Sequence, residues 1–533
     1  MRIQPRRQGA GKAVLVLAAM AAGWRALPVA AADAAPGGGK ATHVVVVVFD
    51  GLRPDSVTAE DTPTLFKLGQ MGTVFAHHHP VYLSSTEVNG SAIATGGYPA
   101  HDGIMANHEY RPGVELLKPI AVEDAKAVRA GDDLLHGQYL RMPTTAEILR
   151  AAGRTTVIAG TKPVALLLDR TVRADSGSPT LFQGETIPTA LLDTITPVVG
   201  KFPAVADPAV AANAGQDAWT TRVLVGRLWA GGVPAFTTLW LSEPDFAQHG
   251  SGPGSATAKA ALRSSDNNLA TVLAALDAAK VRDQTDVFVV SDHGFSTISK
   301  SVDLADVLTQ AGFTAKTKFT EAPTKGNIVV AGEGGSACLY VIEHDPATTR
   351  RLVEFLQGCD FAGAIFCRTE IPGTFTLKQG GIETVDAPDV VMSMRWTNDK
   401  SSTGMPGEIC SVEAKKKVGN HASLSPWDMH NTLIAAGPDL RAGFVSELPS
   451  GNSDVAPTVL WILGASGAKM DGRVLREALT GGPDAAEKPV SRTIEARATV
   501  NGAQWRQYLK TTEFAGVTYY DEGNGAQQPR EKP

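Results

Sequence analysis

The stretch that most constrains the fold is HVVVVVFDG, residues 43–51, in which a run of valines and one phenylalanine ends at Asp50. A continuous β-branched run of this kind is typical of a strand buried on both faces, as in a parallel sheet. A similar run, DVFVV at 286–290, leads into Asp292 and His293. Ligands and catalytic groups of open parallel sheets gather beyond the carboxyl ends of the strands, so we expect polar chemistry at this edge.

Helical and strand-like patterns alternate along much of the chain. This alternation predicts an α/β sandwich with a mostly parallel central sheet flanked by helices. The longest expected helix, 255–280, places Leu262, Leu269, Val272, Leu273 and Leu276 on one face. Other expected helices are 62–72, 144–153 and 217–232, and other expected strands are 154–160 and 235–245.

The rhythm loosens between residues 301 and 420, where Gly, Lys and Thr cluster. We expect this segment to form a smaller inserted cap domain that packs over the carboxyl end of the sheet. The catalytic core then has two parts, 37–300 and 421–485. Residues 486–533 are polar without clear periodicity, which predicts a C-terminal tail.

All four cysteines of the chain lie in the expected cap. An even number in an exported chain permits two disulfides, and we expect at least one. None lies in a CxxC pair, so the pairing stays open. The cysteines are Cys338, Cys359, Cys367 and Cys410.

Residues 1–36 have the layout of a secretory signal peptide: a basic start, the short apolar run AVLVLAAMAAGW and small residues suited to cleavage. The alternative is an uncleaved anchor, but the apolar run is short for a membrane span. We therefore expect a periplasmic or secreted protein with no membrane attachment after cleavage. The net charge of -6 gives no sign of a nucleic-acid-binding surface.

Several expected strands end in residues that can bind metals. Three aspartates and three histidines suffice for two sites with three protein ligands each, leaving positions open for substrate and water. Mixed nitrogen and oxygen ligands favour zinc or manganese over calcium or magnesium. Any one of these residues alone is better explained as a cap or surface group, but their shared position at strand ends favours a metal centre. They are Asp50, Asp245, His249, Asp292, His293 and His421.

The remaining histidines favour ordinary structural roles. The HHH run at 77–79 is a possible metal tract, but it precedes Pro80 with no acidic residue nearby in sequence, so we interpret it as a loop. His430, in the turn DMHN, is interpreted as structural.

A candidate nucleophile lies one helix after Asp50. Ser84, Ser85 and Thr86 precede the helix-like run EVNGSAIATGG. A hydroxyl at a helix N-terminus faces backbone N–H donors and the positive end of the helix dipole, and a metal makes it ionise more readily. Simple helix capping is the alternative for all three.

With these motifs the sequence resembles the alkaline phosphatase superfamily, and most closely its type I phosphodiesterase/nucleotide pyrophosphatase branch. The motifs FDGLRPD, TEVNGSAIATGGYP…GI.AN, EPD…HGSGP, SDHG and GNH occur in that family's order between residues 43 and 475. The resemblance implies that Thr86 is the nucleophile and that Asn89 donates to the developing phosphoryl charge. It also implies one metal on Asp50, Asp292, His293 and Thr86, and a second on Asp245, His249 and His421.

The resemblance implies a two-metal phosphoric ester hydrolase that works through a phosphothreonine and prefers phosphodiesters or nucleotide pyrophosphates. Lys162 is expected to bind substrate phosphate. Family monoesterases often carry Lys-x-Arg there, whereas Val164 takes the arginine position here. A phosphomonoesterase on the same site is the main alternative. A phosphomutase is disfavoured by export, and a non-catalytic binding protein by the full ligand set. The implied partner is a small phosphate ester or nucleotide, and the oligomeric state stays open.

Overall fold

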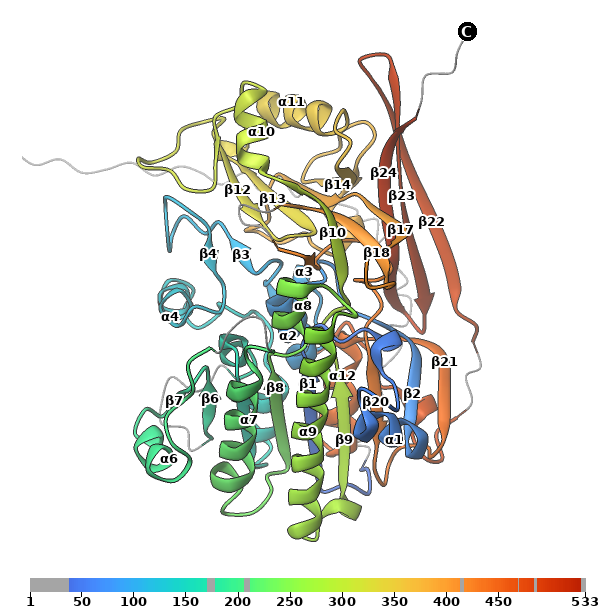
Figure 1. Cartoon of the computed structure of the whole chain (residues 1–533). Coiled ribbons are helices and arrows are strands. Elements are labelled where there is room, and N and C mark those ends of the chain that lie inside the picture. The colour runs from blue at the N-terminus through green and yellow to red at the C-terminus, as the bar shows by residue number, and fades with distance from the viewer. Residues whose placement is uncertain are drawn as a thin grey trace, which may run out of the picture. The chain divides into compact units, whose positions relative to one another are not determined.

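The central element of the computed structural model is a nine-stranded sheet in the order β21-β2-β20-β9-β1-β8-β5-β6-β7 (Figure 1). All of its strands run parallel except β20 and β7. The strands are β1 (His43–Phe49), β2 (Thr73–His79), β5 (Thr156–Gly160), β6 (Thr180–Phe182), β7 (Glu185–Ile187), β8 (Phe236–Leu241), β9 (Thr285–Val290), β20 (Leu433–Ala436) and β21 (Phe444–Gly451). The structure describes residues 38–169, 178–205, 211–412, 417–467, 469–483 and 487–528.

The central strands end level with one another. Phe49 at the end of β1 pairs with Leu241 at the end of β8, and Val48 pairs with Val290, the last residue of β9. Gly160 at the end of β5 pairs with Trp240. The residues that follow these strands therefore emerge side by side at the carboxyl edge of the sheet.

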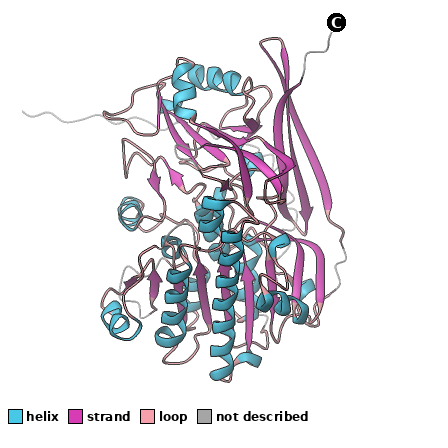
Figure 2. Ribbon diagram, in the orientation of Figure 1, coloured by secondary structure: helices cyan, strands magenta, loops and turns pink. Residues whose placement is uncertain are grey.

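Alternate residues of β1 point to opposite faces of the sheet, and each face packs against helices. Val44, Val46 and Val48 belong to the core under α2 (Thr86–Thr95), α5 (Thr145–Ala151) and α12 (Val455–Ile462). Val45 and Val47 belong to the core under α1 (Pro63–Met71), α7 (Ala214–Val223) and α9 (Ala256–Ala278). Figure 2 shows helices covering the sheet in this way. The predicted apolar face of the longest helix is confirmed, because Leu262, Leu269, Val272 and Leu276 are buried and Leu273 packs against them.

Residues after β9 build two further sheets. A six-stranded sheet consists of β11 (Ala315–Lys316), β12 (Ile328–Gly332), β13 (Ser336–Val341), β16 (Val390–Met394), β14 (Ala362–Cys367) and β15 (Phe375–Thr376). A four-stranded sheet consists of β17 (Trp396–Lys400), β18 (Pro406–Val412), β10 (Ser296–Val302) and β19 (Gly419–Asn420). Smaller elements are β3 (His108–Glu109), β4 (Ile120–Ala121), α3 (Pro99–Asp102), α4 (Ala125–Leu134), α6 (Leu191–Val199) and α8 (Asp245–Ser251).

The six-stranded sheet has a different neighbour on each face. Helices α10 (Leu304–Gln310) and α11 (Pro346–Leu356) contribute to the core on one face. The other face packs against Tyr82, Leu83 and Met105, which flank α2 in the chain. The described residues from 38 onward form one unit, so the cap boundaries at 301 and 420 stay predictions.

The C-terminal residues form a third small sheet where the sequence was expected to end in a tail. Strands β22 (Val490–Val500), β23 (Ala503–Phe514) and β24 (Val517–Gln528) pair antiparallel through two tight turns. Asn501 and Gly502 in the first turn have φ values of 50° and 77°, as a two-residue hairpin requires. The inward-facing residues of β23 include Gln507, which is buried and whose amide bonds to the backbone of Ile365. This polar residue interrupts the alternation of apolar and polar residues that would have predicted a strand.

Two other expectations are corrected. The HHH run at 77–79 completes strand β2 and is not a loop, because it pairs with β21. The expected disulfide is absent, since all four cysteines are free. Cys338 on β13 and Cys367 on β14 are separated by β16, which puts them about 10 Å apart, beyond disulfide reach.

The signal-peptide prediction for residues 1–36 lies outside the described residues. Within the part of the chain that the structure describes, no helix has the length and apolar character needed to span a membrane.

Trp505 on β23 should hold the C-terminal sheet in place. Its side chain is 1% exposed, and its Nε1 donates to the Gly373 carbonyl at 3.0 Å. Trp505→Ala should lower the free energy of unfolding by about 3–5 kcal/mol in urea titration, because it empties a packed site. The neighbouring exposed Arg506→Ala should leave stability close to wild type. Equal stability of the two variants would show that the sheet is not packed as described.

Candidate active site

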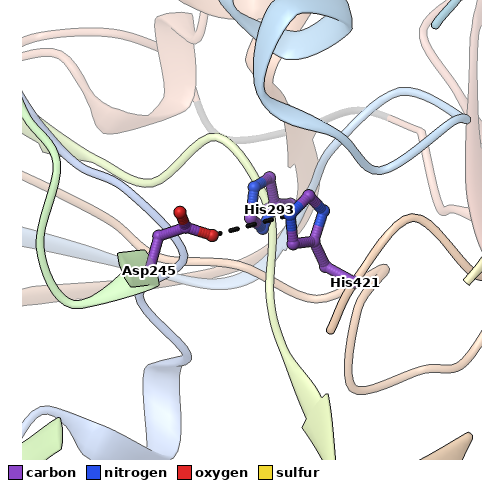
Figure 3. A group of neighbouring side chains, drawn as sticks. All are labelled: Asp245, His293 and His421. Atoms are coloured by element: carbon purple, nitrogen blue, oxygen red, sulfur yellow. Dashed lines mark ion pairs between the residues drawn. The ribbon is translucent and has the colours of Figure 1, made fainter. Parts of the chain in front are cut away.

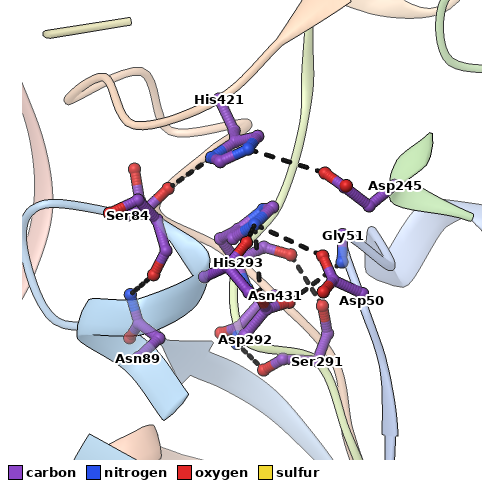
Figure 4. Close-up of polar contacts among 12 residues, drawn as sticks. Asp50, Gly51, Ser84, Asn89, Asp245, Ser291, Asp292, His293, His421 and Asn431 are labelled. Atoms are coloured by element: carbon purple, nitrogen blue, oxygen red, sulfur yellow. Dashed lines mark hydrogen bonds and ion pairs between the residues drawn. The ribbon is translucent and has the colours of Figure 1, made fainter. Parts of the chain in front are cut away.

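Side chains from distant parts of the chain converge at the carboxyl edge of the sheet (Figure 4). Asp50 follows β1, Asp292 and His293 follow β9, and Asp245 follows β8. His421 comes from the segment between β19 and β20. In the described residues, ligand atoms form two groups within 4.8 Å of one another: Asp50, Asp292 and His293, and Asp245, His293 and His421.

The first group faces the hydroxyl of Thr86. Nε2 of His293 lies 3.6 Å from Oδ1 of Asp50 and 3.3 Å from Oδ2 of Asp292. The same nitrogen lies 3.3 Å from Oγ1 of Thr86. Thr86 is the first residue of α2, so its hydroxyl stands at the positive end of the helix dipole.

The second group lies against the first. Oδ1 of Asp245 is 3.2 Å from Nε2 of His249 and 3.5 Å from Nε2 of His421. His293 and His421 stack with ring centroids 3.6 Å apart, so His293 borders both groups (Figure 3). The structure therefore brings together all six residues that the sequence singled out, although His249 lies outside the tightest trio.

Backbone carbonyls fix the orientation of the three histidines. A carbonyl oxygen can only accept, so the ring nitrogen beside it must donate, which leaves the other nitrogen with a free lone pair. Metal-binding histidines are commonly anchored in this way. In each case Nδ1 is anchored: His249 to Gly419 at 3.0 Å, His293 to Gly294 at 2.8 Å and His421 to Ser84 at 3.0 Å.

Each aspartate keeps one buried oxygen without a hydrogen-bond donor. These atoms are Oδ1 of Asp50, Oδ1 of Asp245 and Oδ2 of Asp292. Buried carboxylate oxygens normally have a partner, because removing them from water is costly. Three of them beside imidazole lone pairs are the donor set that a divalent transition metal prefers, so these residues fit metal binding.

Lys162 joins the two groups. It leaves β5, and its Nζ donates at 2.9 Å to Oδ2 of both Asp50 and Asp245. Trp240 donates from Nε1 to the same oxygen of Asp50 at 2.8 Å. Burial opposes the charge on Lys162, but Asp245 and Asp50 raise its pKa well above the usual value. The expected phosphate-binding lysine is thus bonded to one carboxylate of each group.

The electrostatics of the cluster differ between its members. Burial, followed by the charge of Asp292, raises the pKa of Asp50 well above its usual value. Burial also acts to raise the pKa of Asp245, but Lys162 and His249 hold it well below the usual range. Burial and the neighbouring His293 lower the pKa of His421, which keeps it neutral and able to bind a cation.

Gly51 lets the ligands approach so closely. Its φ is 71°, a left-handed conformation that favours glycine. Its N–H donates to Oδ1 of Asp292 at 2.9 Å. A Cβ at this position would lie 3.2 Å from the Cα of Asp245, so a larger residue would push the two groups apart.

The three hydroxyls before α2 are not equivalent. Ser84 Oγ donates to the carbonyl of Ser423 at 2.8 Å, away from the ligands. Ser85 Oγ is buried and has no hydrogen-bond partner in the described structure. Of the three, Thr86 is the residue whose hydroxyl contacts a candidate metal ligand.

Asn89 does not have the free donor that its expected role requires. Its Nδ2 donates to the carbonyls of Val81, Leu83 and Ser85 at 3.1–3.2 Å. Its Oδ1 accepts from the N–H of Val81 and from Nδ2 of Asn452. Both amide hydrogens are used inside the protein, so Asn89 holds the loop that carries Thr86 and does not face a substrate.

Asn107 is a second asparagine at the N-terminus of α2. Its Oδ1 accepts from the N–H of Glu87, next to Thr86, at 3.2 Å, and its Nδ2 has no partner among the described residues. Glu333, which follows β12, accepts from the backbone N–H groups of Asn107 and His108 at 2.8 and 3.0 Å. Asn107 is the last residue of the GIMAN segment at 103–107, which belongs to the motif that carries the family resemblance, although the resemblance gave it no role of its own.

The fold and the cluster together define an α/β protein of the alkaline phosphatase superfamily, as the resemblance implied. Residues 44–418 match the family model described as type I phosphodiesterase / nucleotide pyrophosphatase. The chain belongs to this family.

Named relatives are similar over different lengths. Venom phosphodiesterase 2 of Crotalus adamanteus is 24% identical over 50% of this chain and 28% of its own length. Bis(5'-adenosyl)-triphosphatase enpp4 of Xenopus laevis is 21% identical over 80% of this chain and 79% of its own length. The matched region thus spans little more than a quarter of the venom enzymes.

Solved structures share the fold. Murine ectonucleotide pyrophosphatase/phosphodiesterase 5, as an inactive threonine-to-alanine variant in complex with AMP, gives a TM-score of 0.58 at 17% identity. The match covers 82% of this chain and 100% of that chain. The human protein of the same name gives a TM-score of 0.57 at 16% identity, covering 82% and 99%.

The contacts of the two asparagines predict different effects on stability. Asn89→Ala should lower the melting temperature clearly, because each buried group left without a partner costs about 1–3 kcal/mol. Asn107→Ala should leave the melting temperature near wild type, since its side chain makes one hydrogen bond to the described protein. Differential scanning calorimetry of the two variants tests this. A melting temperature for Asn89→Ala equal to wild type would contradict the structural role.

Proposed function

We propose that the chain is a two-metal phosphoric ester hydrolase with a threonine nucleophile, acting on phosphodiesters or nucleotide pyrophosphates. The observation that carries the proposal is the hydroxyl of Thr86, which lies 3.3 Å from His293 at a helix N-terminus beside two groups of buried ligands. The chain's membership of the type I phosphodiesterase / nucleotide pyrophosphatase family supports the same reaction class.

The orphaned oxygens of Asp50, Asp245 and Asp292 support a metal at each group. Asp50, Asp292 and His293 would hold one ion, and Asp245, His249 and His421 the other. When bound, two divalent ions, with zinc favoured, polarise the phosphoryl oxygens and favour ionised oxygen nucleophiles.

Thr86 carries the covalent step. Its Oγ1 attacks phosphorus and loses its proton as the new P–O bond forms, while the ester bond to the leaving alcohol or nucleotide portion breaks. The leaving oxygen takes up a proton. Water then attacks the phosphorus of this threonine ester, which for a diester substrate still carries the second ester group. The bond between phosphorus and Oγ1 breaks, the phosphate monoester leaves, and Oγ1 takes up a proton from the attacking water. The N-terminus of α2 stabilises negative charge at this position throughout.

Asn107 is proposed to donate to the phosphoryl group. Its unpaired Nδ2 lies next to the N-terminus of α2, where Thr86 starts the helix. Glu333 positions it from β12, so the six-stranded sheet contributes to the geometry of the site. Lys162 holds Asp50 and Asp245 at a fixed spacing by donating to both, and its third N–H is proposed to donate to the substrate phosphate.

Diesters are preferred in this proposal for two reasons. Val164 takes the place of an arginine that would compensate the extra charge of a monoester, and Lys162 is already bonded to two carboxylates. Relatives named as venom phosphodiesterases and as a bis(5'-adenosyl)-triphosphatase support diester and pyrophosphate substrates. The venom enzymes among these relatives also support a periplasmic or secreted location for this chain.

Thr86→Ala should abolish turnover, because no other group present forms the covalent intermediate. Acid-quenched wild-type enzyme incubated with labelled substrate should carry phosphate on a peptide containing Thr86. Ser85→Ala is the matched control and should retain activity, since its hydroxyl makes no contact with the ligands. Phosphoserine in that peptide, or an active Thr86→Ala, would move the nucleophile to another residue.

Asn107→Ala should lower kcat by a factor on the order of 10²–10³, as loss of one transition-state donor does elsewhere. Metal content measured on the same sample should not change, because Asn107 is not a ligand. A variant that lost metal together with activity would point to a structural effect.

Paired turnover tests the proposed function as a whole. Zinc-loaded enzyme should hydrolyse bis-p-nitrophenyl phosphate and a p-nitrophenyl nucleotide faster than p-nitrophenyl phosphate. A chelator should remove all three activities, and zinc should restore them. Faster hydrolysis of the monoester would favour the phosphomonoesterase alternative, and activity that survived complete metal removal would refute the mechanism.

A further inference from the structure

The C-terminal sheet has one covered edge and one open edge. On β24, the N–H of Gly523 donates to the carbonyl of Leu424 at 2.9 Å, and the carbonyl of Gly523 accepts from Nε1 of Trp396 at 2.7 Å. On the opposite side, β22 pairs with β23 and with no other described strand. Figure 1 shows β22 on the outer side of this sheet. The open edge therefore lies on the outside of the protein.

Strand β22 is long and regular for an open edge. It has 11 residues, which is about 37 Å of extended chain, and it pairs with β23 without a bulge. The unpaired N–H and C=O groups of such a strand are a template for a further strand, and proteins that avoid this pairing often interrupt the edge with bulges or prolines. Residues 490–500 contain no proline. The backbone of this edge is thus free to pair.

The hairpin turn determines which backbone groups of β22 face outward. Val500 and Ala503 flank the two-residue turn at 501–502, and residues in that position bond to each other through both N–H and C=O. Bonding then alternates along the strand, so every second residue directs its N–H and C=O away from β23. No described residue outside β22 and β23 bonds to the backbone of these outward residues. They are Ser491, Thr493, Glu495, Arg497 and Thr499.

The other face of β22 carries apolar residues that the protein covers only in part. They pack against the cores beneath the sheet but stay partly exposed at its edge. A strand added beside β22 would remove more of this apolar surface from water, which favours association. The residues are Ile494, Ala496 and Ala498.

Glu495 and Arg497 make the edge complementary to itself. Both lie on the exposed face, one on each side of Ala496. If a two-fold axis passes beside Ala496 of two antiparallel β22 strands, Glu495 of each strand lies opposite Arg497 of the other. An axis at Glu495 or at Arg497 would instead place like charges opposite each other, which is destabilising. The charges therefore favour the register centred on Ala496.

The same register satisfies the backbone. Thr493 then lies opposite Thr499 of the other strand, so residues with outward groups face residues with outward groups, as the hydrogen-bonded pairs of an antiparallel ladder require. On the core-facing side, Ile494 lies opposite Ala498. A two-fold arrangement uses both open edges, and the covered β24 edges end the sheet, so the assembly closes at two copies.

We propose that β22 is the interface between two copies of this chain, in which the two strands pair antiparallel about Ala496. The two C-terminal sheets then form one continuous sheet of six strands. Stable interfaces bury about 1,200–2,000 Å², and a single pair of strands covers only part of such an area, so we expect a dimer that dissociates on dilution.

Sedimentation velocity over a series of protein concentrations tests the proposal. Wild type should change from monomer to dimer as the concentration rises. Thr493→Pro should stay monomeric, because proline lacks the outward N–H and obstructs a neighbouring strand, while no bond to β23 is lost. Thr493→Val keeps the N–H and is the matched control, which should dimerise as wild type does. A melting temperature close to wild type shows that each variant is folded.

Charge exchange tests the register and the identity of the partner. Glu495→Arg and Arg497→Glu each place like charges opposite one another, so each should raise the dissociation constant of the dimer by a factor of about ten or more. An equal mixture of the two variants should associate again, because every charged pair across the interface is then opposite in sign.

A wild type that stays monomeric at the highest concentration would overturn the proposal. Dimerisation of Thr493→Pro equal to that of wild type would also overturn it, because the interface would then lie elsewhere. A mixture of the two charge variants that associates no more tightly than either variant alone would contradict the register about Ala496. None of these residues belongs to the catalytic groups, so the result does not depend on the proposed function.

Discussion

The structure depends on keeping three carboxylates buried in one place. Asp50, Asp245 and Asp292 would repel one another if nothing held them, and burial raises the cost. Lys162 spans two of them at 2.9 Å, and the N–H of Gly51 holds the third. Because those contacts use one oxygen of each carboxylate, the second oxygen of each remains directed into the cluster. The protein thus carries an arrangement of negative charge that is completed by cations.

The surrounding elements serve that cluster from several directions. Level strand ends deliver the ligands, and α2 delivers the hydroxyl of Thr86. A buried network then fixes the loop before α2 to the end of β9. Asn452 donates both to Asn89, which holds that loop, and to the backbone carbonyl of Asp292. The six-stranded sheet adds Glu333, which sets the position of Asn107. Without Asn452, Asn89 or Glu333 the ligands would still be present, but their distance from the Thr86 hydroxyl would no longer be fixed.

The sequence predicts those parts of the molecule that depend on local patterns. Apolar runs such as 43–49 identify buried strands, and the polar residues after them identify the candidate ligands. The direction of a side chain depends on the folded environment and not on local sequence. The resemblance implied a substrate contact for Asn89, whereas its amide faces its own loop. The buried Gln507 hid the C-terminal strands by breaking their alternation, although the Asn501–Gly502 turn signalled a hairpin. Cysteine count alone could not reveal that β16 separates Cys338 from Cys367.

The order of the ligands along the chain has a consequence for how the protein is made. The second group needs His421, and the loop of Thr86 is held by Asn452, so both lie beyond the six-stranded sheet in sequence. A growing chain that has passed only residue 400 contains Thr86 and all three carboxylates but lacks His421 and Asn452. The proposed site is therefore completed only after nearly the whole polypeptide has been synthesised.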